Sequence, residues 1–513
     1  MPRLPRLPLS AAPRINTTNG LERLNEEIKR RTWVVRIFPN ATACLRLVTA
    51  LCVEQSEEWL SGRCCLDIHG LCSCVTAEEP PHPWAAPIIG AAEWRRLHGR
   101  ALGRILPDIY RAHGAGKERT VRILVVGAGI GGLTAALALR QAGCDVHVYE
   151  QANALREVGA GVAISPNATR VLHHLGLADA LAVVGVRSLS HDTRDWRTGA
   201  LLGRIPLGED AVARWGAPFY HLHRADLHNA LRAALGEEQI TLSARCVAIT
   251  QDEATVTAHF ADGREASGDL LIGADGIHSV VREHVAGPDR PLYSGQVSWR
   301  GLAPASVGRE AELEVCHHSF WGPRQQFVCY YVRGGRLVNW VSNTEGDGEW
   351  REESWSARGD REEALALHAE WHPAVRALIA GTDRVFKWAL FDRPPLERWT
   401  RGRVTLLGDA AHPMLPYMGQ GAGQSIEDAL VLARCLAAGR DDPRGALEVY
   451  AALRHERAAA VQAASREAGQ MVRLTDPVEV EARNARLSAS PEAPVTRFDW
   501  IWRYDVDRAT GDE

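Results

Sequence analysis

Three glycines that follow a short apolar run are the first residues whose spacing indicates a chemical role. Gly127, Gly129 and Gly132 stand between the β-branched run 121–126 and an Ala- and Leu-rich stretch at 133–142. The run predicts a buried strand and the stretch predicts a helix. In that order the first glycine allows a tight turn, the second admits a pyrophosphate, and the third lets helix and strand pack closely. The segment therefore predicts a dinucleotide site at the start of a helix.

An acidic residue strengthens this prediction. The run 145–149 predicts a second strand, which ends at Glu150, about 20 residues after the glycines. A carboxylate in this place accepts hydrogen bonds from the 2′-hydroxyl of a ribose, which favours an unphosphorylated adenosine ribose. The motif by itself leaves FAD and NAD open as alternatives.

Two later strand ends each carry an acid beside a glycine. Asp275-Gly276 follows one apolar run, and Gly408-Asp409 follows another. At such a strand end, Asp409 can accept a hydrogen bond from a ribityl hydroxyl. The glycine-rich turn 419–423 then supplies backbone N–H groups at a helix start, which suits a pyrophosphate or the electron-rich pyrimidine edge of a flavin.

These motifs, in this order, resemble those of the class A flavoprotein aromatic hydroxylases. The three together are far more specific than any one of them, and the resemblance covers about residues 119–505. Local matches further resemble the branch that includes salicylate, 3-hydroxybenzoate and 6-hydroxynicotinate monooxygenases. Those matches are Glu157-Val-Gly-Ala-Gly161, Ser165-Pro-Asn167, His223-Arg224-Ala-Asp226, Gln296-Val-Ser-Trp299-Arg300 and Asp499-Trp500.

The resemblance implies an α/β fold with a Rossmann-like FAD-binding domain that is discontinuous in sequence. Its first part is expected at 119–296, and its second part, with C-terminal helices, at 397–513. Residues 297–396 are expected to form an antiparallel substrate-binding sheet between them. Residue patterns predict strands of this sheet at 297–304, 312–320, 325–333 and 336–343. Gly334-Gly335 predicts a two-residue hairpin turn.

FAD is the cofactor that the resemblance implies. The residues expected to contact it are Gly127, Gly129, Gly132, Glu150, Gln151, Val162, Arg224, Val247, Asp275, Asp409, Gly421 and Ala422. Arg224 matches the arginine that contacts FAD in this family, and Val247, by its place in a strand, is expected to reach adenine through its backbone. Two structural alternatives stay open: Arg224 pairs with Asp226 at a helix start, or Asp275 forms an Asx-turn.

The chemistry implied by the resemblance belongs to the flavin. NADH or NADPH reduces FAD, with NADH favoured by the salicylate-like branch, and O2 then forms a flavin C4a-hydroperoxide that hydroxylates an electron-rich ring. The protein must exclude water and hold the substrate as a phenolate. The expected substrate is a small hydroxylated aromatic acid. The alternatives are a bulkier polyketide-like or quinone-precursor substrate, or a non-catalytic FAD-binding regulator.

Four residues are expected to act on the substrate: Tyr330, His317, Pro413 and Gln420. Tyr330 would orient the substrate hydroxyl, against the alternative of a half-buried sheet residue. Only one of His317 and His318 can face the pocket, because strand faces alternate. Near the flavin ring, Pro413 offers a backbone carbonyl and Gln420 a side-chain amide.

The chain departs from the family on the strand that carries Tyr330. Relatives that hydroxylate hydroxybenzoates often have histidine near the places held here by Gln326 and Cys329. The group that activates the phenol is therefore left open. For the substrate carboxylate, the expected partners are Gln326, Arg300 and His317.

Composition sets outer limits on function. A net charge of -4 over 513 residues argues against a dedicated nucleic-acid binder, and no run of about 18 apolar residues predicts a membrane span. The cysteines lack the paired spacing of zinc sites, so no metal is expected, and their scatter favours a reducing, cytoplasmic setting. Residues 1–118 have no clean period and are expected to be a poorly structured extension. A monomer or homodimer is expected.

Overall fold

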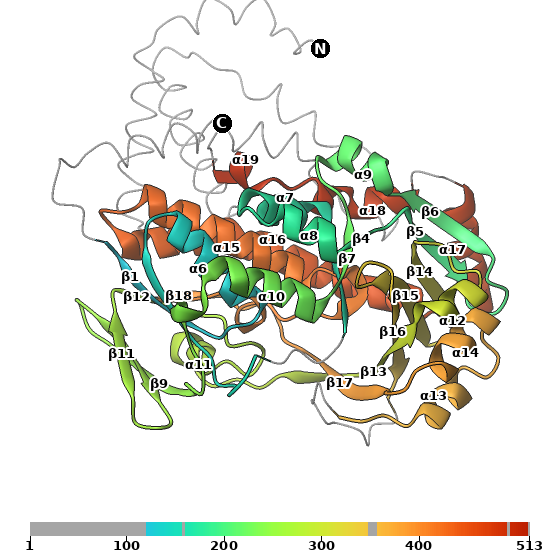
Figure 1. The fold of residues 1–513 in the computed structure, drawn as a ribbon, viewed down its shortest axis with the longest axis horizontal. Coiled ribbons are helices and arrows are strands. Elements are labelled where there is room, and N and C mark those ends of the chain that lie inside the picture. Colours follow the sequence, from blue (N-terminus) through green and yellow to red (C-terminus); the bar gives the residue numbers. More distant parts are fainter. Residues whose placement is uncertain (1–119, 156–159, 347–356, 490–492, 511–513) are drawn as a thin grey trace, which may run out of the picture. The chain divides into compact units, whose positions relative to one another are not determined.

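The computed structural model describes residues 120–155, 160–346, 357–489 and 493–510. The extension expected at 1–118 lies outside these residues. The described chain forms two large sheets and two small ones, and its helices pack against them (Figure 1).

The first large sheet contains the strand predicted before the glycines. Its six strands run in the order β18-β19-β12-β1-β2-β8. They are β1 (Arg122–Val126), β2 (Asp145–Tyr149), β8 (Ile240–Thr241), β12 (Leu270–Gly273), β18 (Thr400–Arg401) and β19 (Val404–Leu406). All neighbours are parallel except β18 and β19. Ile123, Leu124 and Val125 are buried, as a parallel sheet covered on both faces requires.

Three helices begin beside the predicted motifs. They are α6 (Ile130–Gln141), α10 (Arg224–Leu235) and α15 (Gly421–Ala438). The helix predicted at 133–142 is therefore confirmed, although it begins earlier, directly after Gly129. α6 contacts both α10 and α15, and α16 (Pro443–Val472) lies along α15 (Figure 1). The helix starts thus come close to the carboxyl ends of the parallel strands.

Two small antiparallel sheets extend this region. One joins β9 (Cys246–Gln251), β10 (Val256–Phe260) and β11 (Glu265–Gly268). The other joins β3 (Gly161–Ile164), β7 (Tyr220–His223) and β4 (Val186–Arg187). In the second of these sheets, Val162 pairs with Leu222 and Gly161 with His223, which brings β3 beside the start of α10.

The second large sheet has seven strands in the order β17-β13-β16-β15-β14-β5-β6. They are β17 (Phe386–Asp392), β13 (Leu292–Pro304), β16 (Leu337–Glu345), β15 (Gln325–Val332), β14 (His317–Gly322), β5 (Ser190–Asp195) and β6 (Leu201–Pro206). The predicted antiparallel pairing is present except between β5 and β14, which are parallel. Residues from 190 to 206, well before the expected boundary at 296, thus join the seven-stranded sheet.

Two local predictions for this sheet are wrong. The strand expected at 312–320 begins only at His317, because α12 (Ala305–Glu310) and an irregular segment precede it. The turn at Gly334-Gly335 is a four-residue connection, because Val332 pairs with Leu337 across it. The first three residues of the connection, 333–335, all have positive φ. Glycine adopts this left-handed conformation readily, and here the residue before the two glycines adopts it as well.

The remaining helices cover the sheets. α12, α13 (Arg361–Leu367) and α14 (Pro373–Ala380) follow strands of the seven-stranded sheet, where Trp299, Phe327 and Trp340 form a buried cluster. The predicted C-terminal helices are present as α16, α17 (Pro477–Ala489), α18 (Ala493–Trp502) and α19 (Val506–Thr510). α17 and α18 pack beside β6 (Figure 1). Other helices are α7 (Pro166–His174), α8 (Ala178–Val184), α9 (Gly208–Trp215) and α11 (Val280–Ala286).

None of the helices in the described part of the chain combines the length and the apolar character that a membrane span requires.

Candidate active site

The three predicted glycines have different surroundings. A side chain at Gly127 would clash with the backbone of Ala274, and one at Gly132 would clash with the carbonyl of Gly127. Gly127 also has a φ of +106°, which favours glycine. At Gly129, which precedes α6, an added Cβ would meet nothing within 4 Å. Gly127 and Gly132 therefore allow close packing of the backbone. Gly129 leaves space for a ligand at the N-terminus of α6, the positive end of the helix dipole.

Glu150 is held in place by the same turn. One carboxylate oxygen accepts a hydrogen bond from the N–H of Ala128, and the other accepts one from Ala152, both at 2.8 Å. Each oxygen keeps a lone pair for a further donor such as a ribose hydroxyl. Gln151, beside it, is exposed.

Asp275 is engaged in its own turn. Its carboxylate accepts hydrogen bonds from Ser279 Oγ at 2.5 Å and from the N–H of Val281 at 3.2 Å, at the start of α11. Burial raises the pKa of Asp275 above its usual range, although these hydrogen bonds oppose the rise. The carboxylate therefore caps the turn that follows it, through groups four and six residues ahead, and these contacts are longer in range than the Asx-turn of the structural alternative. Val247, on β9, is 47% exposed.

A cavity of about 580 Å3 extends from the six-stranded sheet to the seven-stranded sheet. Ten of the predicted site residues line it: Gly129, Val162, Arg224, His317, Tyr330, Asp409, Pro413, Gln420, Gly421 and Ala422. Gly127, Gly132, Glu150, Gln151, Val247 and Asp275 are not among the residues that line it. After what the sequence predicts to bind at each end, we name Gly129, Arg224, Asp409, Gly421 and Ala422 the flavin end, and His191, His317, Trp321, Tyr330 and Arg497 the substrate end.

Asp409 offers an open acceptor at the flavin end. It lies in the short turn η4 (Gly408–Ala410) after β19, and its side chain is exposed to the cavity while protein surrounds it. Burial raises the pKa of Asp409, against the opposing charges of His412 and Arg224. No residue in the described part of the chain donates a hydrogen bond to this carboxylate. An added Cβ at Gly421 would lie 3.9 Å from it, so Asp409 and the start of α15 face the same space.

A buried charge network stands behind the flavin end. Arg454 on α16 donates to Glu427 and Asp428 on α15, each at 2.6 Å, and all three side chains have no exposed area. Asp428 also contacts His412 at 2.6 Å and accepts the N–H of Gly408 at 3.0 Å. Burial alone would raise the pKa of Asp428, but His412 and Arg454 outweigh it and lower it to about 2. The network thereby fixes the turn that carries Asp409.

The polar groups of Gln420 and Pro413 already have partners inside the protein. Gln420 donates to Ser165 Oγ at 2.9 Å, and its amide oxygen accepts from Asn167 at 3.2 Å. The carbonyl of Pro413 accepts from Gln462 at 2.7 Å. The side-chain amide expected from Gln420 is thus used to join α15 to the Ser165-Pro-Asn167 segment, whereas the Pro413 carbonyl keeps a second lone pair.

Histidine rings gather at the substrate end. His317 lines the cavity, while His318 faces away and contacts the carbonyl of Glu314 at 3.1 Å, as strand alternation predicts. His317 Nδ1 lies 3.0 Å from His221 Nε2, and its ring centre lies 4.2 Å from that of His191. Burial lowers the pKa of His191 to about 3 and those of His221 and His317 well below their usual range. The rings are therefore neutral at pH 7.

Tyr330 stacks on this histidine group. Its ring lies 4.1 Å from the His221 ring, with an angle of 13° between their planes. A side chain at Gly161 would clash with Tyr330 and Asn339, so the glycine lets β3 approach β15 closely. Burial raises the pKa of Tyr330 strongly, and the charge of Arg300 only partly opposes this. The phenol therefore stays protonated and able to donate.

Three residues of the substrate end, His191, Trp321 and Arg497, are absent from the sequence predictions, and so is His221, which contacts His317. His191 lies on β5, which pairs in parallel with β14. His221 lies on β7, and Arg497 lies on α18. A single histidine or arginine gives no spacing signal, and only tertiary packing brings His191 and Arg497 to the cavity and His221 beside His317. The register that sets His191 opposite His317 is the feature that could have identified it.

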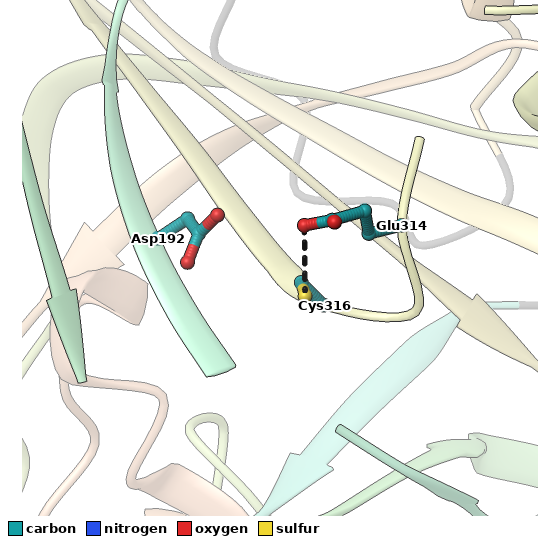
Figure 2. A group of neighbouring side chains, drawn as sticks. All are labelled: Asp192, Glu314 and Cys316. Carbon is teal, nitrogen blue, oxygen red and sulfur yellow. Dashed lines mark hydrogen bonds between the residues drawn. The ribbon is translucent and has the colours of Figure 1, made fainter. Parts of the chain in front are cut away.

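One group of side chains has the composition of a metal site. The ligand atoms of Asp192, Glu314 and Cys316 lie within 4.8 Å of one another. Figure 2 shows the three side chains, with the Cys316 thiol hydrogen-bonded to Glu314. The buried Asp192 carboxylate, however, accepts hydrogen bonds from Arg194 at 2.8 Å and from Arg204 at 2.7 and 2.8 Å. The guanidinium groups of Arg194 and Arg204 balance the charges of the two acids. The group is therefore an ion-pair network that connects β5 with β6 and with the start of β14.

The sequence comparisons agree with the geometry. Residues 120–465 match the family described as FAD binding domain. A 3-amino-4-hydroxybenzoate 2-monooxygenase of Streptomyces cremeus is 41% identical over 75% of this chain and 95% of its own length. A 6-hydroxynicotinate 3-monooxygenase of Bordetella bronchiseptica is 38% identical over 67% of this chain and 91% of its own. Residues 5–62, outside the described part, match the Mutator family of transposases.

A comparison with a solved structure supports the same family. The chain is similar to a salicylate hydroxylase in complex with its substrate, with a TM-score of 0.66 and 30% identity over 77% of this chain and 98% of that one. The predicted family is therefore confirmed, and with it the FAD cofactor and the enzymatic function. The chain belongs to the class A FAD-dependent aromatic hydroxylases, monooxygenases that act on small aromatic acids.

Proposed function

We propose that this enzyme hydroxylates a monocyclic aromatic carboxylate that carries a ring hydroxyl, with O2 and with NADH or NADPH as the reductant. The observation that carries the proposal is the single cavity that joins an FAD-compatible end to an end lined by aromatic and imidazole rings. A volume of about 580 Å3 has to hold the flavin ring as well as the substrate, which favours one small ring over a polyketide-like substrate.

The residues of the flavin end suit FAD. The open space at Gly129 lies at the start of α6, where unpaired N–H groups can meet a pyrophosphate. Asp409 offers a carboxylate to a ribityl hydroxyl, and Gly421 and Ala422 offer the N–H groups of the first turn of α15. Bound FAD supplies the transfer of electrons from NAD(P)H to O2 and the oxygen that enters the ring.

The residues of the substrate end exclude water and bind the proton that the substrate hydroxyl releases. Tyr330 stays protonated, so its hydroxyl donates to the oxygen of a bound phenolate. His317 is neutral, and in the tautomer whose Nδ1–H donates to His221 Nε2, its own Nε2 can receive a substrate proton. Apolar surfaces of Trp321, Phe219 and Phe498 complete the lining and limit the access of water.

The names of two relatives support this substrate class. 3-Amino-4-hydroxybenzoate and 6-hydroxynicotinate are both single-ring carboxylates with a ring hydroxyl. Both combine the anionic group and the electron-donating group that the proposal requires. Five described cysteines are all free thiols, which suits the cytoplasm, and we expect a monomer or homodimer there.

The proposal is tested with the FAD-loaded full chain and a panel of aromatic compounds. The panel contains 3-amino-4-hydroxybenzoate, 6-hydroxynicotinate, 3-hydroxybenzoate, salicylate and a set of polyketide-like and quinone-precursor phenols. At least one monocyclic acid should accelerate NADH or NADPH oxidation and gain one oxygen atom from isotopically labelled O2. A response to the bulky phenols alone would reject the proposed substrate class.

A further inference from the structure

We propose that Arg497 binds the carboxylate of the aromatic substrate and so determines that the enzyme accepts acids. This inference deepens the proposed function and rests on it. Arg497 lies on α18 and lines the cavity beside Trp321 and Phe498. The guanidinium carbon lies 5.8 Å from the Trp321 ring centre and 5.4 Å from that of Phe498, within range of cation–π contact.

The described residues supply no anion that pairs with the charge of Arg497. Among the residues that the structure describes, no carboxylate forms an ion pair with it, and its hydrogen-bond partner is the Met418 sulfur at 3.6 Å. A guanidinium has five N–H donors, and a thioether is a weak acceptor. Burial lowers the pKa of Arg497 to about 10, a value at which the group is still charged at pH 7.

A buried cation without a counter-ion is unfavourable, because desolvation is not offset by a nearby anion. Aromatic faces compensate only part of this loss. The remaining open side of Arg497 is the cavity, so an anion that enters the cavity would complete the pair. A planar carboxylate suits the guanidinium, since the two form parallel hydrogen bonds.

The three partners expected from the sequence fit this role less well. Gln326 donates its amide to Ser319 Oγ at 2.9 Å. His317 is uncharged at neutral pH because burial lowers its pKa. Arg300 lies 4.4 Å from the Trp388 ring centre, and its charge acts on the Tyr330 phenol, which suits a phenolate better than a carboxylate.

The position of Arg497 also gives the bound acid a direction. Its charge contributes to the lowered pKa of His191, so the two side chains are close. The His191 ring lies 4.2 Å from His317, and the His317 ring lies 5.4 Å from Tyr330. An acid held at Arg497 would therefore lie along these rings, with its hydroxyl directed toward His317 and Tyr330.

The test compares acids with their amides, which have nearly the same shape but no charge. Equilibrium dialysis on the FAD-loaded full chain gives the Kd of 3-amino-4-hydroxybenzoate and of 3-amino-4-hydroxybenzamide, and of 6-hydroxynicotinate and 6-hydroxynicotinamide. Arg497→Met should weaken binding of the acids about 10- to 100-fold, as expected for a lost charge-assisted hydrogen bond, and leave the amides nearly unchanged. Arg497→Gln serves as a second variant if Arg497→Met unfolds.

Arg483→Met is the matched control. Arg483 is also buried and lies 5.2 Å from the Trp321 ring centre, but it donates to the carbonyl of Met471 and does not line the cavity. Its replacement should leave the ratio of acid to amide affinity unchanged. Equal weakening of acids and amides in the Arg497 variants, or an unchanged ratio, would overturn the assignment of Arg497. If the parent enzyme itself shows no preference for acids, the proposed substrate class fails and the inference fails with it.

Discussion

Arg454 and Arg497 are both surrounded by protein, yet their environments are opposite. Burial would lower the pKa of Arg454, but Asp428 and Glu427 outweigh it and raise the pKa well above its usual range. Around Arg497 no described acid opposes burial, and the pKa falls to about 10. Behind the flavin end, charge is balanced within the fold. At the substrate end, the charge of Arg497 is balanced only when an anionic substrate binds.

The largest expected effect is a loss of stability when the buried ion pairs of Arg454 are removed. Arg454→Met removes the arginine that pairs with the buried Asp428 and leaves Glu427 with Arg457 alone, which should lower the free energy of unfolding by about 3–5 kcal/mol. Chemical denaturation of the FAD-free protein measures it. Arg503→Met is the control, because its pair with Asp499 is half exposed and contributes at most about 1 kcal/mol. Equal losses in the two variants would show that the buried network does not stabilise the fold.

A smaller effect tests Asp409, whose carboxylate has no donor among the residues that the structure describes. Asp409→Ala should keep the fold but weaken FAD binding by about 1–3 kcal/mol, because the cofactor loses a buried acceptor. Flavin fluorescence during dilution gives the Kd. Asp262→Ala changes an exposed acid in the hairpin between β10 and β11, and should leave FAD affinity as it is. Retention of FAD by the Asp409 variant at the parent's affinity would remove Asp409 from the flavin site.

The smallest effect concerns the uncharged part of the substrate end. Tyr330→Phe keeps the ring that stacks on His221 and removes only the hydroxyl, so stability should hardly change. With the phenolate less well oriented, NADH should still be consumed but more hydrogen peroxide should form per product. A peroxide assay beside product analysis measures this coupling.

Tyr331→Phe is the control for that variant. Its hydroxyl donates to the carbonyl of Leu313 at 3.1 Å and belongs to the cluster on the other face of the sheet. Coupling should therefore stay at the parent's value. If Tyr330→Phe also couples as well as the parent, the role of orienting the phenolate passes to His317 or to the carbonyl of Pro413.

The flavin end could be predicted from the sequence because its signals are local. The glycine turn, the strand before it and the helix after it are consecutive, so backbone sterics and helix geometry set their arrangement. Gly408-Asp409 and the turn at 419–423 are likewise close in sequence to the strand and helix that position them. Each of these elements is present where the patterns predict it.

The substrate end could not be predicted in the same way, because distant segments build it. Parallel pairing of β5 with β14 sets His191 opposite His317, and α18 brings Arg497 from near the chain's end. Such contacts depend on tertiary packing, which leaves no periodic signal in either segment. The family resemblance directed attention to Gln326, Arg300 and His317, whose charge state or existing partners become visible only in three dimensions.

The pairing of β12 with β19 has a consequence for synthesis in the cell. Leu271 pairs with Val404, so the ribosome must make all the intervening chain before β19 exists. At about 5–20 residues per second, this takes roughly 7–27 s. During that time the nascent chain exposes an apolar strand edge that can pair with other chains. We expect the yield of folded enzyme to depend on translation speed and on chaperones that cover this edge.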